Sequence, residues 1–472
     1  MQQRTRRSDR LRALLTAGFC GRDWATPVVL AATLLALTAS VARTFSSMPL
    51  ASVDESAHVD YVLRVWHGQL PVLSDGIRFR PGFGGTPPVQ WVAQHPPLFY
   101  LLLAPVVGPL VDAGHPVQAV VLGRLVNAVF VAAIVPAAAW AAGRCFPGVV
   151  RLPATVAVVT ASTSVLVVQG GVVYNDSLAA LTCALACGVA GAALRSGVGP
   201  GLAVGGAFVA AAGATTRLSF ALWLVAIVVA FALARTVRFG RLRGAWARVA
   251  VTAVPVLAAA AASGWFWLRN EALTGSFSGR PTAWPGYTPR PHYSEAEVVS
   301  MLGFWRQLFA LYRGSLPIAS PLPWVLLLVP VLLFVAALVL RRLRPWAPAD
   351  DDRWPRRLVV AMLVVVTLLF VVVEIRYTAG GGAPLNRYTL TVLLPIVFAM
   401  AAGFLAWRRA ATVLVLVWGA VAFVPTWSLL RFEGSDLVEH SGTVVVLAFA
   451  AAVVCAAAML VTYAMAARST AR

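Results

Sequence analysis

Two carboxylates and a histidine lie close together near the start of the chain, in the segment V-D-E-S-A-H-V-D-Y at residues 53–61. A carboxylate held at a lipid surface is a candidate general base for a hydroxyl group, so Asp54 and Glu55 are the first candidates for catalysis. Asp54 and His58 are one helical turn apart, and they are also candidate ligands for a divalent cation. The structural alternative is a helix N-terminus, which Asp54 caps and whose dipole Glu55 complements.

Four arginines stand near the predicted outer ends of apolar segments: Arg217, Arg269, Arg376 and Arg387. A guanidinium group binds a phosphate leaving group in a bidentate manner and stabilises the charge that accumulates on it. The structural alternative for each arginine is contact with lipid headgroups. Arg387 is the strongest candidate, because Asn386 and Tyr388 flank it and a glycine-rich stretch precedes it.

The remaining polar residues near helix ends have structural interpretations. His95 precedes two prolines and suits an interfacial helix start, and Asp176 suits an N-cap beside Asn175. Glu374 is expected to pair with Arg376 at the interface. Arg124 is assigned no role.

The elements that must position these residues are membrane helices. Hydrophobic residues make up 60% of the 472 residues and charged residues 12%, and the mean hydropathy is +0.80. This composition indicates an all-α polytopic membrane protein, in which apolar runs of roughly 20 residues cross the lipid as helices. We expect about 12 or 13 transmembrane helices. The apolar runs lie at 25–42, 152–170, 177–194, 199–215, 218–234, 249–268, 321–340, 358–373, 388–406, 411–428 and 443–465, with less certain candidates at 96–111 and 118–142.

The charges predict the orientation of these helices. All 38 basic residues are arginine, and the net charge is +20. Most of the arginines fall in one set of loops, which the positive-inside rule places in the cytoplasm, so the basic charge indicates topology and not nucleic-acid binding. The predicted organisation is a cytoplasmic basic N-terminus at 1–24, a single transmembrane domain at 25–466 and a tail at 467–472. If segments 96–111 and 118–142 both cross the membrane, the downstream loops invert or another predicted helix is wrong. If 96–111 re-enters the membrane without crossing it, the arginine pattern is preserved.

Two long loops are predicted on the extracytoplasmic side, at 43–95 and 269–320, and loops of this length are usually functional or disordered. The first loop contains an amphipathic stretch from Ala57 to Trp66, which suits a helix lying on the membrane surface. The second is rich in aromatic residues, which suit a membrane interface or a loop that closes over a substrate. These aromatic residues are Trp284, Tyr287, Tyr293, Trp305 and Tyr312. The five cysteines fall in predicted helices or cytoplasmic segments and indicate no disulfide framework.

Several short motifs together resemble the GT-C superfamily of membrane glycosyltransferases, and are most similar to its family 39-like group of protein O-mannosyltransferases and aminoarabinose transferases. The motifs are D-E-x-x-H-x-x-Y at 54–61, W-H-G-Q-L-P at 66–71, Q-H-P-P-L-F-Y-L-L-L at 94–103, Y-N-D-S-L-A at 174–179 and N-R-Y-T-L-T-V-L-L-P at 386–395. They follow one another along the chain, although each is short. The chain departs from the mannosyltransferases in lacking a large soluble domain in its later half, which leaves the acceptor open.

The resemblance implies transfer of a sugar, with inversion, from a polyprenyl-phosphate donor to an extracytoplasmic lipid, glycan or protein. It makes Asp54 the catalytic base and Glu55 its catalytic neighbour. The expected substrate-binding residues are His58, Tyr61, His95, Tyr174, Asn175, Asp176, Arg217, Arg387 and Tyr388. The expected location is a bacterial plasma membrane, with the active site on the extracytoplasmic face.

The expected partners are the lipid-linked donor and membrane lipid, with no nucleic acid, and a divalent cation is the only candidate cofactor. No P-loop, dinucleotide-binding motif or Cys/His metal motif is present in the sequence. The main alternative is a lipid or polysaccharide transporter or flippase, which is expected to carry polar residues at mid-membrane, broken helices and internal repeats. A non-catalytic scaffold, with the outer loops as recognition surfaces, is a third possibility.

Overall fold

The computed structural model describes residues 25–240, 242–279, 291–340, 353–430 and 433–469. Several predictions concern residues outside these ranges. They are the basic N-terminus at 1–24, the aromatic residues Trp284 and Tyr287, the part of the arginine-rich loop at 341–352, and the end of the tail at 470–472.

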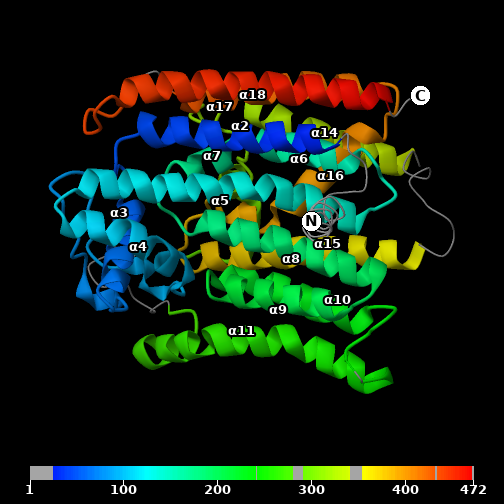
Figure 1. Cartoon of the computed structure of the whole chain (residues 1–472), viewed down its shortest axis with the longest axis horizontal. Coiled ribbons are helices and arrows are strands. Elements are labelled where there is room, and N and C mark those ends of the chain that lie inside the picture. Colours follow the sequence, from blue (N-terminus) through cyan, green and yellow to red (C-terminus); the bar gives the residue numbers. More distant parts are fainter. Residues whose placement is uncertain (1–24, 241, 280–290, 341–352, 431–432, 470–472) are drawn as a thin grey trace, which may run out of the picture.

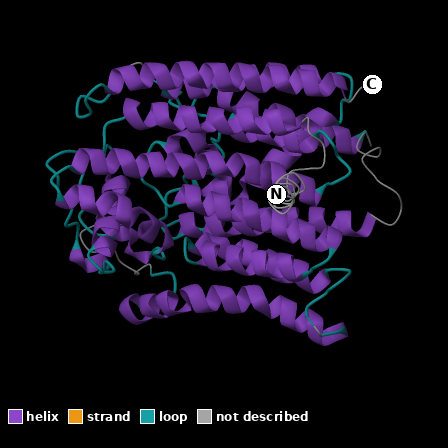
Figure 2. Ribbon diagram, viewed as in Figure 1, coloured by secondary structure: helices purple, strands orange, loops and turns teal. Residues whose placement is uncertain are grey.

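Helices form almost all of the regular structure, and most run side by side along the long axis of the molecule (Figures 1 and 2). The described residues contain no β-strand beyond isolated bridges. The helices are α2 (Ala25–Ser46), α3 (Val53–Trp66), α4 (Leu98–Asp112), α5 (Pro116–Cys145), α6 (Leu152–Ala161), α7 (Ser164–Gly170), α8 (Asp176–Ser196), α9 (Pro200–Ala214), α10 (Ala221–Leu233), α11 (Gly244–Thr274), α12 (Glu295–Ser300), α13 (Leu302–Leu308), α14 (Leu322–Val339), α15 (Arg353–Ala379), α16 (Leu393–Leu405), α17 (Ala411–Leu429) and α18 (Ser441–Ser469). Short 3₁₀ turns include η2 (Trp91–Gln94), η3 (Leu218–Phe220) and η6 (Tyr388–Val392).

The predicted all-helical, multi-pass membrane fold is confirmed, whereas the helix count differs. Within the described residues, nine helices are long and apolar enough to cross a membrane, or ten if the bent pair α6 and α7 forms one span. The predicted 12 or 13 helices included three shorter apolar segments: α4, α9 and the run Leu218–Leu233. Length is the reason for the difference, because a helix rises only about 1.5 Å per residue.

Helix α4 corresponds to segment 96–111, which the arginine pattern singled out. It lies beside α3 at one end of the bundle and packs antiparallel to the first half of α5, since the rings of Phe99 and Phe130 are 6.4 Å apart and a Cβ atom at Gly123 would lie 3.2 Å from Val107 (Figure 1). The chain reverses at Gly114, which has a φ of 79°, and Pro116 then starts α5. Glycine adopts such a positive φ without steric cost, and proline is favoured in a first helical turn. Segment 96–111 is therefore a short helix that leads into the long helix α5.

The most buried helices of the bundle include α6, α8 and α16. In α8, 89% of the most apolar window is buried, compared with 22% in α18 at the periphery. Small residues allow this close packing: a Cβ atom at Gly188 of α8 would lie 1.9 Å from the ring of Trp140 in α5. The apolar side chains that remain exposed on the outer helices α11, α14, α15 and α18 are suited to lipid.

Helix α3 confirms the helix predicted in the first outer loop, but it does not lie on a surface. Ala57, Val59 and Val62 are fully buried, and so is Asp60 on the polar face. Asp60 accepts hydrogen bonds from the Arg64 side chain at 2.8 Å and from two backbone amides of the following loop. The polar face is thus satisfied inside the protein, and α3 is enclosed by its own loop and α4. This enclosure fixes the start of α3, which carries Asp54.

Candidate active site

The site forms where four segments that are distant in the sequence meet. They are the start of α3, the turn that precedes α8, the segment between α9 and α10, and the turn that leads into η6. Asp54 Oδ2 lies 2.6 Å from Arg387 Nη2. Arg387 Nε lies 3.9 Å from Asp176 Oδ2, and the other oxygen of Asp176 pairs with Arg217. We refer to Asp54, Asp176, Arg217 and Arg387 as the four-charge cluster.

Two tyrosines hold the arginines of this cluster. The guanidinium of Arg387 lies 4.7 Å from the centre of the Tyr174 ring, and both arginines lie over the ring of Tyr388. Such cation–π contacts are worth about 0.5–2 kcal/mol each, depending on desolvation. Tyr174 is itself positioned by Ser52, whose hydroxyl lies 2.5 Å from its own. The aromatic rings therefore limit the orientations of both guanidinium planes.

Solvent exposure differs within the cluster. The side chain of Asp54 is 27% exposed and that of Asp176 is 4% exposed. Arg387 is largely enclosed, and its Nε atom has no hydrogen-bond partner among the described residues. Burial alone would lower the pKa of Arg387, but the charges around it, Asp176 foremost, raise that pKa well above its ordinary value. Asp54 is therefore the more accessible carboxylate, and it lies beside a permanently charged arginine.

Glu55 points away from Asp54 into a separate, fully buried ion pair. Its two oxygens accept hydrogen bonds from Arg124 Nε and Nη2, both at 2.7 Å. They also accept the backbone amides of Leu50 and Val173, at 3.0 and 2.9 Å. All four bonds stabilise the charged carboxylate in place, which suits Glu55 to positioning the neighbouring segments. These contacts do not test the predicted catalytic role of Glu55, which stays a prediction.

Arg124, which was assigned no role from the sequence, is the partner that completes this ion pair. Its remaining donors bind the backbone oxygens of Thr44, Ser47 and Met48 at the end of α2. One feature of the sequence could have indicated this role: Arg124 stands inside the apolar segment that forms α5, and an ionisable residue at such a position is rarely without a specific partner. The partner itself is 69 positions away in the chain and could not be read from the spacing.

The structure contradicts the N-cap interpretations of Asp54 and Asp176. The N-caps of α3 and α8 are Ser52 and Asn175, and neither makes a side-chain capping bond. Asn175 instead donates to Thr216 O at 3.2 Å, which joins the turn before α8 to the segment before α10. Both aspartates lie in first turns, but their carboxylates are directed to arginines from other segments.

Other expected contacts also differ. Arg376 pairs with Glu295 of α12 at 3.2 Å, so the expected pairing with Glu374 is wrong. Arg269 donates to the backbone oxygen of Pro71 at 2.9 Å and thereby fastens the first outer loop to α11. These two arginines therefore bind other segments of the protein, and their contact with lipid headgroups stays a prediction.

His58, Tyr61 and His95 form an aromatic group directly beneath the cluster. His58 Nδ1 lies 2.9 Å from the hydroxyl of Tyr100, and the rings of His58 and His95 are nearly parallel at 6.1 Å. Tyr61 donates to the backbone oxygen of His95 at 2.9 Å. Burial lowers the pKa of both histidines well below the ordinary value, and the charges of Arg217 and Arg387 lower it further. Both histidines are therefore expected to be neutral at pH 7, so that each ring has one donor and one acceptor nitrogen.

The donors around Asp54 do not fit a divalent cation. Asp54 and His58 are one turn apart as expected, but Asp54 binds Arg387 and His58 binds Tyr100 through Nδ1. Within the described part of the chain, no group of three His, Cys, Asp or Glu side chains is arranged to hold a metal ion. The Arg387 guanidinium occupies the position beside the Asp54 carboxylate that a bound cation would take.

The chain is similar in structure to the crystal structure of an oligosaccharyltransferase from Archaeoglobus fulgidus in complex with Zn and sulfate. The TM-score is 0.45 and the sequence identity is 13%. The similarity covers 85% of this chain and 52% of the other protein, so the chain spans about half the length of the protein that it matches. No family model and no curated protein matches the sequence. The chemistry of the site is therefore inferred from its own residues.

The buried pair of Glu55 and Arg124 yields a stability prediction. Glu55→Gln is expected to lower the free energy of unfolding by about 3–5 kcal/mol, because the Arg124 charge then stays buried without its partner. The double variant Glu55→Gln, Arg124→Met is expected to recover only part of this loss, because the backbone oxygens of Thr44, Ser47 and Met48 then lack the Arg124 donors. Denaturant unfolding in detergent measures both. Glu439→Gln, at an exposed position, is the control, and equal stability of Glu55→Gln and this control would contradict the assignment.

The buried histidines yield a pH prediction. Because their pKa values are lowered in the folded state, the unfolded chain binds more protons below about pH 6.5, and the stability of the fold decreases as the pH falls from there. Each histidine contributes a slope of up to about 1.4 kcal/mol per pH unit. Unfolding curves of the wild type and His95→Gln between pH 7 and 5 measure this slope of the free energy of unfolding against pH. The variant is expected to lose stability less steeply, while the exposed His292→Gln keeps the wild-type slope; identical slopes in all three would refute the prediction.

Proposed function

We propose that this protein is a glycosyltransferase that moves a sugar from a polyprenyl-phosphate donor to a hydroxyl-bearing acceptor, with Asp54 as the general base. The observation that carries the proposal is the four-charge cluster, in which the partly exposed carboxylate of Asp54 lies 2.6 Å from a buried arginine. The motif resemblance of the sequence points to the same reaction. A cluster of this kind at the end of a membrane bundle suits a substrate whose polar head is attached to a lipid.

The proposed reaction is a single displacement. The acceptor oxygen forms a bond to the anomeric carbon while the bond from that carbon to the phosphate oxygen breaks. The phosphate leaves with the bonding electron pair, and Asp54 takes the proton of the acceptor hydroxyl. Attack from the face opposite the leaving group inverts the anomeric configuration. A positioned base contributes roughly 10²–10⁴-fold to the rate of such a step.

Asp54 suits the role of base better than the other carboxylates near the site. The oxygens of Glu55 are filled by four hydrogen bonds, and Asp60 is buried with Arg64. Asp176 is 4% exposed and pairs with Arg217. Arg387 binds one oxygen of Asp54 and holds the carboxylate in one orientation, which leaves the other oxygen for the acceptor.

The surrounding residues suit the recognition of a sugar. Tyr174 and Tyr388 offer ring faces and hydroxyl groups, and the neutral histidines His58 and His95 both donate and accept hydrogen bonds. Asp176 adds a carboxylate acceptor held by Arg217. We assign these residues to the donor sugar, as positioning and binding groups, and leave the identity of the sugar open.

The positive-inside rule supports an extracytoplasmic site. The cluster contains the start of α8, and Arg195 lies near the other end of that helix, about 30 Å away for a helix of 21 residues. Arg144 ends α5, which begins at the same end of the bundle as α4. Arginines thus gather at the end opposite the cluster, which supports our proposal that the cluster lies on the extracytoplasmic side of a cell membrane.

The transfer prediction concerns Asp54. Asp54→Asn is expected to reduce sugar transfer from a radiolabelled polyprenyl-phosphate donor by about 10²–10⁴-fold, because an amide cannot accept the proton. The fold should remain, since Asp54 is partly exposed and Glu55 keeps the start of α3 in place. The assay uses purified protein in lipid and a panel of donors and acceptors. Glu439→Gln, a carboxylate substitution in another outer loop, should transfer at the wild-type rate. Equal transfer by Asp54→Asn and this control would refute the assignment.

One feature favours the alternative of a transporter. Helices α6 and α7 form a broken span that bends by 60°, and broken helices often mark transport sites. Here, however, Leu311 O accepts the backbone amide of Val165 and the hydroxyl of Ser164, so protein fills the break. A scrambling assay with fluorescent polyprenyl phosphate in proteoliposomes separates the two functions. Lipid movement without any transfer would favour the transporter.

A further inference from the structure

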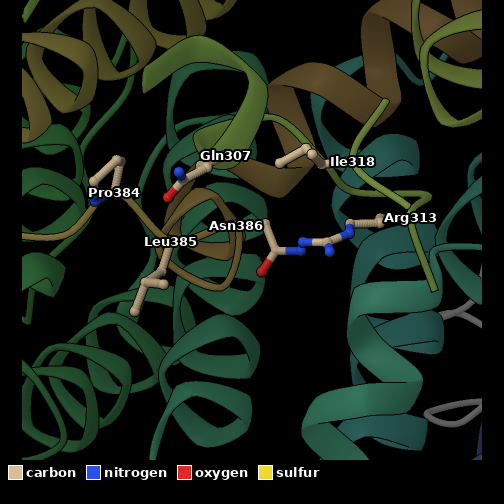
Figure 3. A pocket seen from close by; sticks show the side chains of 6 residues that line it. All are labelled: Gln307, Arg313, Ile318, Pro384, Leu385 and Asn386. Carbon is tan, nitrogen blue, oxygen red and sulfur yellow. The ribbon is translucent and has the colours of Figure 1, made fainter. Parts of the chain in front are cut away.

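A cavity of about 390 Å³ lies between α13 with its following segment and the turn before η6 (Figure 3). The lining residues are Gln307, Arg313, Ile318, Pro384, Leu385 and Asn386. Figure 3 shows the Arg313 side chain extending toward the carboxamide of Asn386. We refer to this space as the Arg313 cavity.

The cavity has a direct structural link to the cluster. Asn386 donates to Ala310 O at 3.0 Å, which ties the two walls together. The next residue, Arg387, binds Asp54. A ligand in the cavity therefore lies beside the backbone that carries the central arginine of the cluster.

Arg313 is held firmly on the protein side. Its Nε donates to Leu316 O at 3.0 Å. The next amide, of Gly314, donates to the hydroxyl of Ser164 at 2.9 Å, at the break between α6 and α7. Gly314 has a φ of 57°, and a Cβ atom there would lie 2.1 Å from Pro425 O, so this backbone path requires glycine. The turn is thus built into the bundle and fixes the backbone from which Arg313 extends.

The terminal nitrogens of Arg313 differ from those of the other site arginines. Arg217 and Arg387 are paired with Asp176 and Asp54, so two positive charges meet two negative ones. Among the described residues, no carboxylate forms an ion pair with Arg313, and its side-chain hydrogen bond to Leu316 O uses Nε and not the terminal nitrogens. An incoming anion would therefore meet a neutralised cluster at Asp54 but an uncompensated cation in the Arg313 cavity.

We infer that the Arg313 cavity is an anion subsite that binds a phosphate group. The two terminal nitrogens of Arg313 form the charged fork, and the amides of Asn386 and Gln307 are the additional polar groups. Ile318, Pro384 and Leu385 supply apolar surface beside it, which suits the first carbons of a lipid chain. The phosphate belongs either to a lipid headgroup or to a soluble phosphate compound. The inference rests on the proposed function only in naming phosphate as the leaving group of the reaction.

The experiment measures binding and not turnover. Fluorescent polyprenyl phosphate is titrated into purified full-length protein in nanodiscs. Arg313→Gln is expected to weaken binding by about tenfold or more, because charge-assisted hydrogen bonds to phosphate are lost. Arg313→Lys should bind between the two, since it keeps the charge but not the fork. Arg306→Gln, an exposed arginine on α13 that does not line the cavity, should bind as the wild type does.

Two further ligands identify the source of the phosphate. Uncharged polyprenol should bind the wild type and Arg313→Gln equally, because it has no phosphate. Inorganic phosphate should bind more weakly than the lipid, with the same dependence on Arg313, if the subsite accepts a lipid headgroup. Dependence on Arg313 for inorganic phosphate alone would assign the subsite to a soluble phosphate compound. Equal binding of both phosphate ligands by the wild type and Arg313→Gln would overturn the inference.

The outcomes also separate this inference from the proposed function. Asp54→Asn is expected to transfer sugar about 10²–10⁴-fold more slowly, while its binding of polyprenyl phosphate still depends on Arg313. If Arg313→Gln binds phosphate as the wild type does while transfer still requires Asp54, the subsite is wrong and the proposed function remains. If binding requires Arg313 but no variant or wild type transfers sugar, the subsite remains and the proposed function is wrong.

Discussion

The ion pair between Glu55 and Arg124 is the interaction on which the rest of the site depends. It places a charged carboxylate, with no exposed surface, against a guanidinium from α5, at 2.7 Å. The same two side chains bind the end of α2, the start of α3 and the turn before α8 through backbone groups. Two isolated charges could not be buried there, because each would cost several kcal/mol without its partner. The pair therefore fixes the backbone positions from which the side chains of Asp54 and Tyr174 extend.

The main features of the fold could be predicted from composition and apolar run length, because lipid requires backbone groups to be satisfied within helices. The number of membrane-crossing helices could not be predicted. Whether α4, α9 and Leu218–Leu233 cross the membrane depends on their length and on their packing against neighbouring helices. The enclosure of α3 inside the protein also could not be predicted from its sequence pattern. Its alternation of polar and apolar residues suits a membrane surface equally well, and only the bonds of Asp60 to a later loop show that α3 is enclosed.

The candidate site could also be predicted only in part from the sequence. The aspartates and arginines of the four-charge cluster were all among the residues expected from the sequence, because polar groups at the ends of apolar helices are few. The pairing between them was not predictable, since Asp54 and Arg387 are 333 positions apart. Arg313 was overlooked, because a single arginine in a long outer loop has no distinctive spacing. Its environment depends on the fit of the Gly314 turn into the break between α6 and α7.

We propose that Asp54 and Arg387 act as one unit in sugar transfer, and a double-mutant cycle on the transfer rate is the direct test. The rates of wild type, Asp54→Asn, Arg387→Gln and the double variant are measured with the same polyprenyl-phosphate donor in lipid. The double variant is expected to be no slower than Asp54→Asn alone, because the arginine acts by orienting a carboxylate that is already absent. Losses that multiply would show two independent contributions and would contradict it.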